Sequence, residues 1–265
     1  MIAAARAGKH IFVEKPMALS VADAEEMMAA CDQSGVKLMV GYLMRFHVGH
    51  QRLSQMIEAG ELGQIVFGRA QLTCWYPAME GALRQVPELG GGGAFIDMGT
   101  HCLDLLEVLI GKAKRLVAFM STITQSYPVE DTGTIMVEFE GGAQGIVDVN
   151  FNVPDEAAQN VLEIRGTGGL VLADHTIGQE PGGPMTAYIP AAVGGYDAAQ
   201  ERGEAGIARP IEYEPVNTYQ AEVEHFVDCI EQDLEPITGG AEALRFVRLT
   251  ELVYKSAATG KVITL

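Results

Sequence analysis

A strand–helix–strand pattern in the first 42 residues constrains this chain more than any other feature. An apolar run over 10–16 stops at a proline, and a second run covers 37–42. Between them, Ser20 begins a helical pattern, with Asp23 at the capping-box position, and Gly35 ends it. Two strands joined by one helix in this spacing form a βαβ unit, so the two strands are predicted to be parallel.

From residue 64 the pattern changes to many short strands. Alternating apolar positions and glycine-containing turns predict strands over 65–75, 115–124, 132–139, 144–151, 161–164 and 170–173. One long helix is expected near 94–110, two more over 217–232 and 241–258, and a last short strand over 262–265. The Gly- and Pro-rich stretch 174–215 is expected to be a long excursion or lid. The predicted fold class is therefore α/β plus α+β, in which a small parallel unit precedes a large, mostly antiparallel sheet flanked by helices.

Charge and composition limit the partners. The formal net charge of −17 argues against nucleic acid, whose phosphates are held by clustered Lys and Arg, and against anionic membranes. No apolar run reaches the ~18–20 residues of a membrane span, and the first residues lack the apolar core of a signal peptide. The four cysteines form no CxxC pair, so we expect reduced thiols in a cytoplasmic protein.

Lys15 stands where the first predicted strand ends. Ligands of open α/β sheets lie beyond the carboxyl ends of the strands, and a lysine there can anchor negative charge or donate a proton. Spacing alone fits a solvated lysine beside a loop proline at least as well, so both interpretations stay open at this point.

A second candidate group lies on the helix expected near 94–110. Asp97, His101 and Asp104 share one helical face, and the opposite face is expected to meet the core (Met98, Cys102, Leu105, Leu106 and Leu109). A carboxylate four residues before a histidine can orient the imidazole as a general base. An ordinary amphipathic helix with its polar side in water has the same pattern. The glycine run 90–93 favours a site, because bare backbone lets a ligand approach closely.

Other chemistries receive less support from the sequence. The same helical stripe could hold a metal, but no further His or Cys cluster completes a coordination shell, so no metal is expected. His47 and His50 flank a helix start and are expected to be surface or capping groups. The chain lacks a G-x-S-x-G elbow and a P-loop, which leaves esterase and NTPase activities unsupported. A metal-dependent lyase or hydrolase is a minor alternative.

Four segments, in this order and spacing, resemble the Gfo/Idh/MocA family, which includes glucose–fructose oxidoreductase and inositol dehydrogenase. The resemblance runs over nearly the whole chain and is carried by residues 7–16 (AGKHIFVEKP), 41–46 (GYLMRF), 61–65 (ELGQI) and 91–104 (GGGAFIDMGTHCLD). It implies a Rossmann domain followed by a domain built on a large, mostly antiparallel sheet. We accordingly expect residues 1–46 to be the C-terminal remnant of the dinucleotide-binding domain, and 47–265 to be the substrate and oligomerisation domain.

The resemblance also implies an activity, which is hydride transfer between NAD or NADP and a sugar or polyol hydroxyl. Lys15 would contact both nicotinamide and substrate, and Asp97 would hydrogen-bond the substrate. His101 would take the hydroxyl proton as hydride leaves for the nicotinamide, and Asp104 is a further substrate-binding candidate. Alcohol oxidation needs such a base and a nearby positive charge that favours the developing alkoxide.

On the cofactor side, the resemblance places Glu14, Lys15, Pro16 and Arg45 at the nicotinamide half, often with a cis peptide bond before the proline. The family's opening strand, G-x-G-x-x-G loop and helix do not precede Lys15 in this sequence. We therefore expect a truncated chain with a raw sheet edge and poor nucleotide affinity. The alternative to a dehydrogenase is a catalytically silent sugar-binding or scaffold protein. In either case we expect a homodimer or homotetramer formed through the face of the large sheet.

Overall fold

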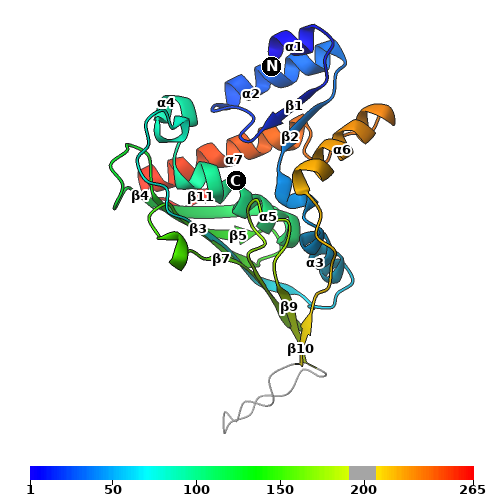
Figure 1. Cartoon of the computed structure of the whole chain (residues 1–265), viewed down its shortest axis with the longest axis vertical. Helices are drawn as coiled ribbons and strands as arrows, with labels where there is room; N and C mark the ends of the chain where they lie inside the picture. The colour runs from blue at the N-terminus through cyan, green and yellow to red at the C-terminus, as the bar shows by residue number, and fades with distance from the viewer. Residues whose placement is uncertain (191–206) are drawn as a thin grey trace.

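The computed structural model describes residues 1–190 and 207–265, which form one small and one large β-sheet (Figure 1). In the small sheet, β1 (Ile11–Glu14) pairs in parallel with β2 (Leu38–Gly41). The helices α1 (Ile2–Arg6) and α2 (Val21–Ser34) lie beside this sheet. The Ser20 side chain accepts a hydrogen bond from the Asp23 N–H at 3.1 Å, and Gly35 is left-handed with φ of 62°. The predicted βαβ unit is thus confirmed.

The outer edge of β2 is paired with a later segment of the chain. The Thr238 carbonyl accepts a hydrogen bond from the Val40 N–H at 3.0 Å, and the Thr238 hydroxyl donates to the Val40 carbonyl at 2.6 Å. Gly239 forms an isolated antiparallel bridge with Met39. A segment almost two hundred positions later in the chain therefore completes this edge.

The large sheet has nine strands in the order β10-β9-β8-β7-β3-β6-β5-β4-β11, and every neighbouring pair except β3–β6 is antiparallel. This confirms the predicted fold class. The strands are β3 (Ile65–Thr73), β4 (Ala113–Ser121), β5 (Thr132–Phe139), β6 (Gln144–Asn150), β7 (Asn160–Gly166), β8 (Gly169–Asp174), β9 (Met185–Ile189), β10 (Ile207–Pro210) and β11 (Ile263–Thr264).

Two of these strands lie within the stretch that the sequence predicts to be a lid. Met185–Ile189 adds to the sheet beside β8, and Ile207–Pro210 then forms the outermost strand. The stretch 174–215 is therefore partly an extension of the sheet, because backbone pairing with β8 supplies order that its Gly and Pro content obscures. The remainder of the predicted lid, 191–206, lies outside the described residues.

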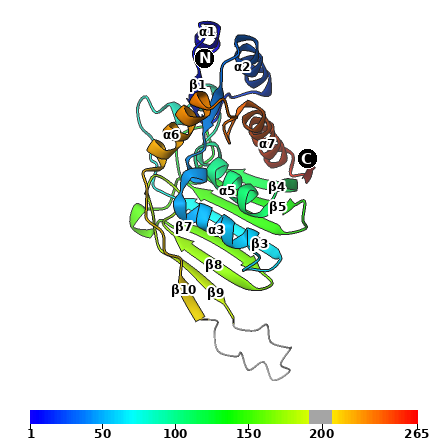
Figure 2. The same cartoon turned by 90° about the vertical axis from the view of Figure 1, so that its right-hand side faces the viewer.

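Helices cover one face of the large sheet. Figure 2 shows α3 (Val48–Glu58) and α5 (Thr100–Ile110) in front of the strands, with α7 (Gly240–Thr259) beside them. The remaining helical segments are η1 (Leu43–Phe46), η2 (Leu83–Gln85), α4 (Pro87–Gly90), η3 (Phe95–Gly99), η4 (Asp155–Ala157) and α6 (Thr218–Glu231). α5 packs against β3 and β6, and inward strand positions such as Val147 and Ile135 are fully buried. In the part of the chain that the structure describes, no helix combines the length and the apolar character needed to cross a bilayer.

The C-terminal helices also reach the small sheet. α7 packs against α2 and β2 as well as β4, and α6 packs beside η1. The domain boundary predicted between residues 46 and 47 stays a prediction. The contacts of α6 and α7 with η1, α2 and β2 cross that boundary.

Candidate active site

The helix that carries the predicted catalytic residues begins as a π-helix, not as an α-helix. Phe95–Gly99 has π geometry and continues directly into α5. A Cβ on Gly99 would lie 2.4 Å from the Phe95 ring, so glycine lets that ring fold over its own helix. The first turn is held by Glu130, whose backbone and side chain accept the N–H groups of Ala94 and Phe95. Single π turns of this kind occur frequently at functional sites.

Lys15 meets this π turn. Its Nζ donates to the Asp97 carbonyl at 2.5 Å and to the Asp97 carboxylate at 3.2 Å, and it lies 3.4 Å from the Ile96 carbonyl. The side chain is only 7% exposed, which decides against the solvated lysine. Burial lowers the pKa of Lys15, and the Asp97 carboxylate partly offsets this effect. The Lys15–Pro16 peptide bond is cis, as the resemblance implies.

His101 lies one helical turn after Asp97 and is partly buried. Burial first, and then the neighbouring charges of Lys15 and Arg84, hold the pKa of His101 well below its ordinary value. The imidazole is therefore neutral at neutral pH and has a lone pair that can accept a proton. Among the described residues, its buried Nδ1 has no hydrogen-bond partner.

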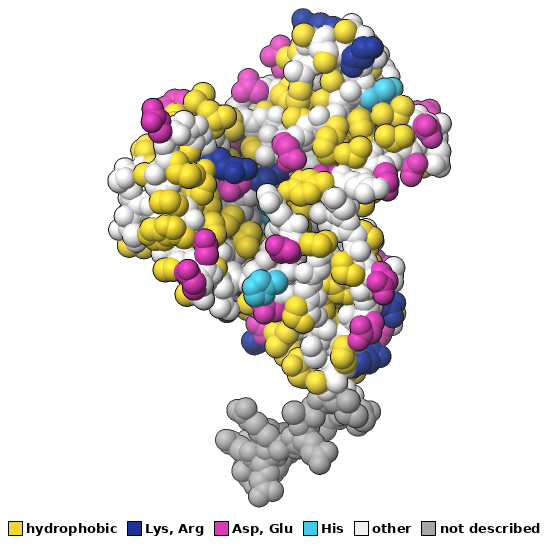
Figure 3. All heavy atoms as spheres, in the orientation of Figure 1, with side chains coloured by type: hydrophobic (Ala, Val, Ile, Leu, Met, Phe, Trp, Pro, Cys, Tyr) yellow, Lys and Arg dark blue, Asp and Glu magenta, His cyan; other side chains and the backbone are white. Residues whose placement is uncertain are grey.

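Arg84 is a site residue that the sequence does not identify. Its Nε lies 3.0 Å from the Asp97 carboxylate, so Asp97 is bound by two cations, Arg84 and Lys15. Arg84 lies in η2, within the loop 76–90 that follows β3. A cleft of about 340 Å³ lies between the 15–19 segment and this loop. Figure 3 shows a hollow beside the lobe that carries α4, in which basic and acidic side chains gather.

The glycine run 90–93 serves packing more than ligand approach, which corrects the expectation for two of its members. A Cβ on Gly92 would lie 1.9 Å from the Tyr254 hydroxyl, and one on Gly93 would lie 1.9 Å from the Glu130 carbonyl. Those spaces are already filled by the protein. Gly90 does line the cleft.

Arg45 and Asp104 bind each other and do not line the cleft. The Asp104 carboxylate accepts from Arg45 Nε at 3.1 and 3.0 Å and from Nη2 at 2.5 Å. Asp104 is fully buried, so the side of α5 expected to be wet is in fact closed. Burial raises the pKa of Asp104, and the guanidinium opposes that shift. Both residues thus hold the helix and η1 together.

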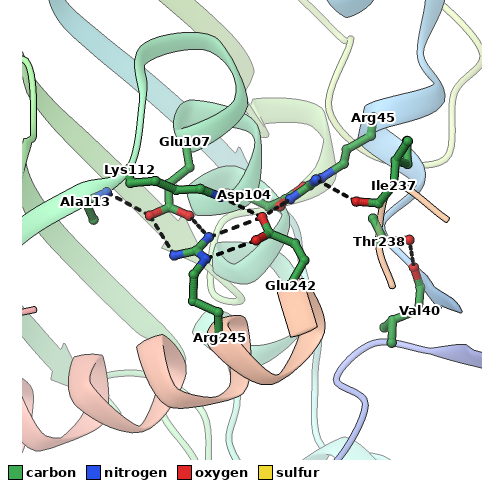
Figure 4. Close-up of polar contacts among 10 residues, drawn as sticks. All are labelled: Val40, Arg45, Asp104, Glu107, Lys112, Ala113, Ile237, Thr238, Glu242 and Arg245. Carbon is green, nitrogen blue, oxygen red and sulfur yellow. Dashed lines mark hydrogen bonds and ion pairs between the residues drawn. The ribbon is translucent and has the colours of Figure 1, made fainter. Parts of the chain in front are cut away.

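Arg45 and Asp104 belong to a larger network of charged groups (Figure 4). Arg45 also donates to Glu242 at 2.9 Å, and Lys112 contacts the same carboxylate at 2.6 Å. Arg245 joins Glu242 to Glu107, a fully enclosed carboxylate that also accepts the Ala113 N–H. The pKa of Glu242 is strongly lowered, because the hydrogen bonds from its three cationic partners outweigh its burial. This network ties α7 to α5.

His47 and His50 differ partly from expectation. His47 does cap α3, since its Nδ1 accepts the His50 N–H at 3.3 Å. Both rings are buried, however, and they stack with centroids 4.2 Å apart. Burial lowers the pKa of His47 to about 4 and that of His50 to about 3.

The alternative of a metal site on the Asp97–His101–Asp104 stripe can also be compared with the geometry. Asp97 pairs with Lys15, and Asp104 pairs with Arg45, so the stripe does not converge. Within residues 1–190 and 207–265, no three His, Cys, Asp or Glu side chains gather in an arrangement that could hold a metal ion.

Comparisons with known proteins agree with this architecture. A sequence profile described as the NAD-binding Rossmann fold of an oxidoreductase family matches residues 1–42, and the GFO/IDH/MocA C-terminal domain matches residues 50–172. Among solved structures, aldose-aldose oxidoreductase from Caulobacter crescentus is 30% identical, with a TM-score of 0.86 over 100% of this chain and 74% of that one. The chain belongs to the Gfo/Idh/MocA family of oxidoreductases.

Two further relatives in this family are sugar dehydrogenases by name. D-apiose dehydrogenase from Paraburkholderia graminis is 28% identical over 99% of this chain and 68% of its own length. D-xylose 1-dehydrogenase (NADP(+)) 2 from Haloferax volcanii is 26% identical over 99% of this chain and 75% of its own. The Gfo/Idh/MocA resemblance inferred from the four sequence segments is thereby confirmed.

Proposed function

We propose that this protein is an NAD(P)-dependent dehydrogenase that oxidises a hydroxyl group of a sugar or polyol. The observation that carries the proposal is the placement of three side chains. Lys15, buried just after β1, binds Asp97 at the cleft, and His101 follows one helical turn later on α5 as a neutral imidazole. Family membership supports the reaction class, and the sugar dehydrogenases among the relatives support the substrate class.

The residues present fit a nicotinamide. Glu14, Lys15 and Pro16 lie at the carboxyl end of β1, and ligands of parallel sheets bind at such ends. When bound, the nicotinamide accepts the hydride that leaves the substrate carbon. In this proposal Glu14 and Lys15 face the nicotinamide half. Arg45 does not contact the cofactor but positions η1, because it is hydrogen-bonded to Asp104.

The protein's own groups would then handle the proton and the developing charge. His101 accepts the hydroxyl proton while the Lys15 ammonium stabilises negative charge on the same oxygen. Asp97 accepts from a second substrate hydroxyl and holds Lys15 in place through the 3.2 Å ion pair. The pair of cations on Asp97 leaves the cleft with an excess of positive charge, which favours the alkoxide over the alcohol.

The test is a hydride-transfer assay on the full product of the gene, with NAD and NADP and a panel of aldoses and polyols, followed by nicotinamide absorbance. His101→Ala should lower kcat by about 10²–10⁴-fold, the range for loss of a general base. His175→Ala is the matched control, because the His175 side chain is 63% exposed and should leave kcat unchanged. A folded protein that transfers no hydride from any of these substrates would support the silent scaffold instead.

We also propose a homodimer or homotetramer formed through the outer face of the large sheet, and a cytoplasmic location. On that face Phe119 is 65% and Met136 is 53% exposed, and Met136 lines a groove together with Phe67 and Ile146. A continuous apolar surface on a sheet is typical of a protein interface. The four free cysteines support a reducing compartment.

A further inference from the structure

A buried acidic side chain lies at the carboxyl ends of β1 and β2 and has no role in the chemistry described above. Glu222, in the second turn of α6, is 1% exposed. Among the described residues, its Oε2 is buried without a hydrogen-bond partner. A buried polar atom left unsatisfied is destabilising, so packing alone gives no reason for a carboxyl group at this position.

Packing fixes where this carboxyl group points. The Phe226 ring, one helical turn further along α6, lies 5.9 Å from the Phe12 ring on β1. Phe226 also forms a small core with Met39 of β2 and Phe46 of η1. These contacts hold α6 against the small sheet, so the placement of Glu222 follows from apolar contacts on both strands.

Glu222 faces a second carboxyl group across the end of the sheet. Glu14 and Gly41 are register partners at the last position of β1 and β2. A Cβ built on Gly41 would lie 3.5 Å from Oε2 of Glu14 and 3.5 Å from Oε2 of Glu222. The two carboxyl groups therefore flank the same glycine, and the absence of a side chain there leaves room for a methyl-sized group between them.

The charged surroundings favour a proton on Glu222. Burial and the Glu14 carboxylate raise the pKa of Glu222 to about 7, and both carboxylates also act on nearby Tyr219. The cation on η1, Arg45, is bound by Asp104 and Glu242, and His225 of α6 accepts the Ile237 N–H. Near neutral pH the end of the small sheet thus presents a carboxyl O–H from α6 beside the Glu14 side chain.

We propose that Glu222 is a further cofactor-binding residue, whose protonated carboxyl donates a hydrogen bond to an oxygen of the nicotinamide riboside half of the cofactor. This inference rests on the proposed function. A nicotinamide riboside carries a carboxamide carbonyl and ribose oxygens that accept such a bond, and ribose hydroxyls that donate to Glu14. An ionised Glu222 has no hydrogen to donate and adds like charge beside Glu14, so it weakens binding.

The test uses the full product of the gene and reduced nicotinamide mononucleotide, a probe that carries only the nicotinamide half. Its Kd, measured by calorimetry, should rise above about pH 7 and approach tenfold per pH unit, because only the protonated form binds well. Glu222→Gln keeps an N–H donor and cannot ionise, so its affinity should stay within about threefold of the low-pH value at every pH. Glu222→Leu should lose about tenfold at low pH. ADP, which lacks the nicotinamide half, should bind with no break near pH 7 in any variant.

A readout without turnover accompanies the binding data. The carboxyl carbon-13 resonance lost in Glu222→Gln should titrate near pH 7 in the free protein, and its midpoint should move to higher pH when the mononucleotide binds. A flat pH profile in the wild type, or equal affinities for the Gln and Leu variants with melting temperatures preserved, would overturn the role of Glu222 alone. Failure of the wild type to bind any nicotinamide nucleotide at any pH would overturn the proposed function, and this inference with it.

Discussion

Replacement of Asp104 by alanine should strongly destabilise the protein and only secondarily affect substrate binding. Asp104 receives three hydrogen bonds from Arg45, and the two side chains are 1% and 12% exposed. Removal of one partner from a buried ion pair costs about 3–5 kcal/mol, because the other charge stays buried. Glu242 still contacts Arg45 at 2.9 Å in the variant, so we expect the lower end of that range, about 3 kcal/mol.

The assay is urea and thermal unfolding at pH 7. For a chain of this size, about 3 kcal/mol corresponds to a fall in Tm of about 6–12 °C. The double variant Arg45→Met with Asp104→Leu should recover most of the loss, since an apolar pair of similar volume replaces the ion pair without a stranded charge. Glu242 keeps Lys112 and Arg245 in that variant.

A different result would show that Asp104 binds the substrate. A Tm of Asp104→Ala close to the wild-type value, together with a raised KM for the sugar, would refute the positioning role. It would return Asp104 to the substrate-binding role that the family resemblance implies. A double variant no more stable than the single one would show that the stranded Arg45 charge is not the source of the loss.

Three further predictions follow from packing, charge and surface. Gly92→Ala should cost about 1–3 kcal/mol of unfolding free energy by chemical denaturation, because its Cβ would lie 1.9 Å from the Tyr254 hydroxyl. The His47–His50 pair, buried neutral with pKa values of about 4 and about 3, should lower stability as pH falls below about 6.5, since only the unfolded state takes up protons there. The free energy of unfolding should fall by at most about 1.4 kcal/mol per pH unit for each histidine. Urea unfolding midpoints between about pH 6.5 and 5 measure this fall. Phe119→Glu should dissociate the oligomer in light scattering, because it places a charge on the outer sheet face.

Each of these has a matched control within the chain. Gly141→Ala meets no atom within 4 Å and should leave stability nearly unchanged. His175→Gln removes a mostly exposed imidazole and should keep the wild-type pH profile, whereas His50→Gln should flatten it. Val227→Glu changes an equally apolar but separate surface on α6 and should leave the oligomer intact. Equal effects of a variant and its control would contradict the reasoning for that pair.

Local signals account for what the sequence predicts well. The capping box at Ser20 and Asp23 forms as expected, and β5 has the predicted bounds, because alternation and turn glycines are properties of the segment itself. The family pattern groups Lys15, Asp97 and His101, and the first two are in direct contact in the fold. Whether these residues act as the resemblance implies stays a prediction.

Long-range contacts account for what the sequence leaves hidden. Asp104 is buried against Arg45, which lies 59 positions earlier. Helical periodicity does not reveal this partner, and it therefore predicts that the Asp104 face of the helix is exposed to solvent. Glu222 lies one turn before Phe226, which packs on a strand far earlier in the sequence, and nothing in the local pattern of α6 marks it. Arg84 lies in a loop with little periodicity, and its ion pair with Asp97 is visible only in three dimensions.

The pairing of Thr238 with Val40 has a consequence for how the protein is made. During synthesis on the ribosome, β2 emerges before the segment that completes its edge, which is translated 198 positions later. Throughout that interval the edge and its apolar neighbours, including Met39, are open to other chains and to chaperones. The small sheet is therefore synthesised well before it can become fully native.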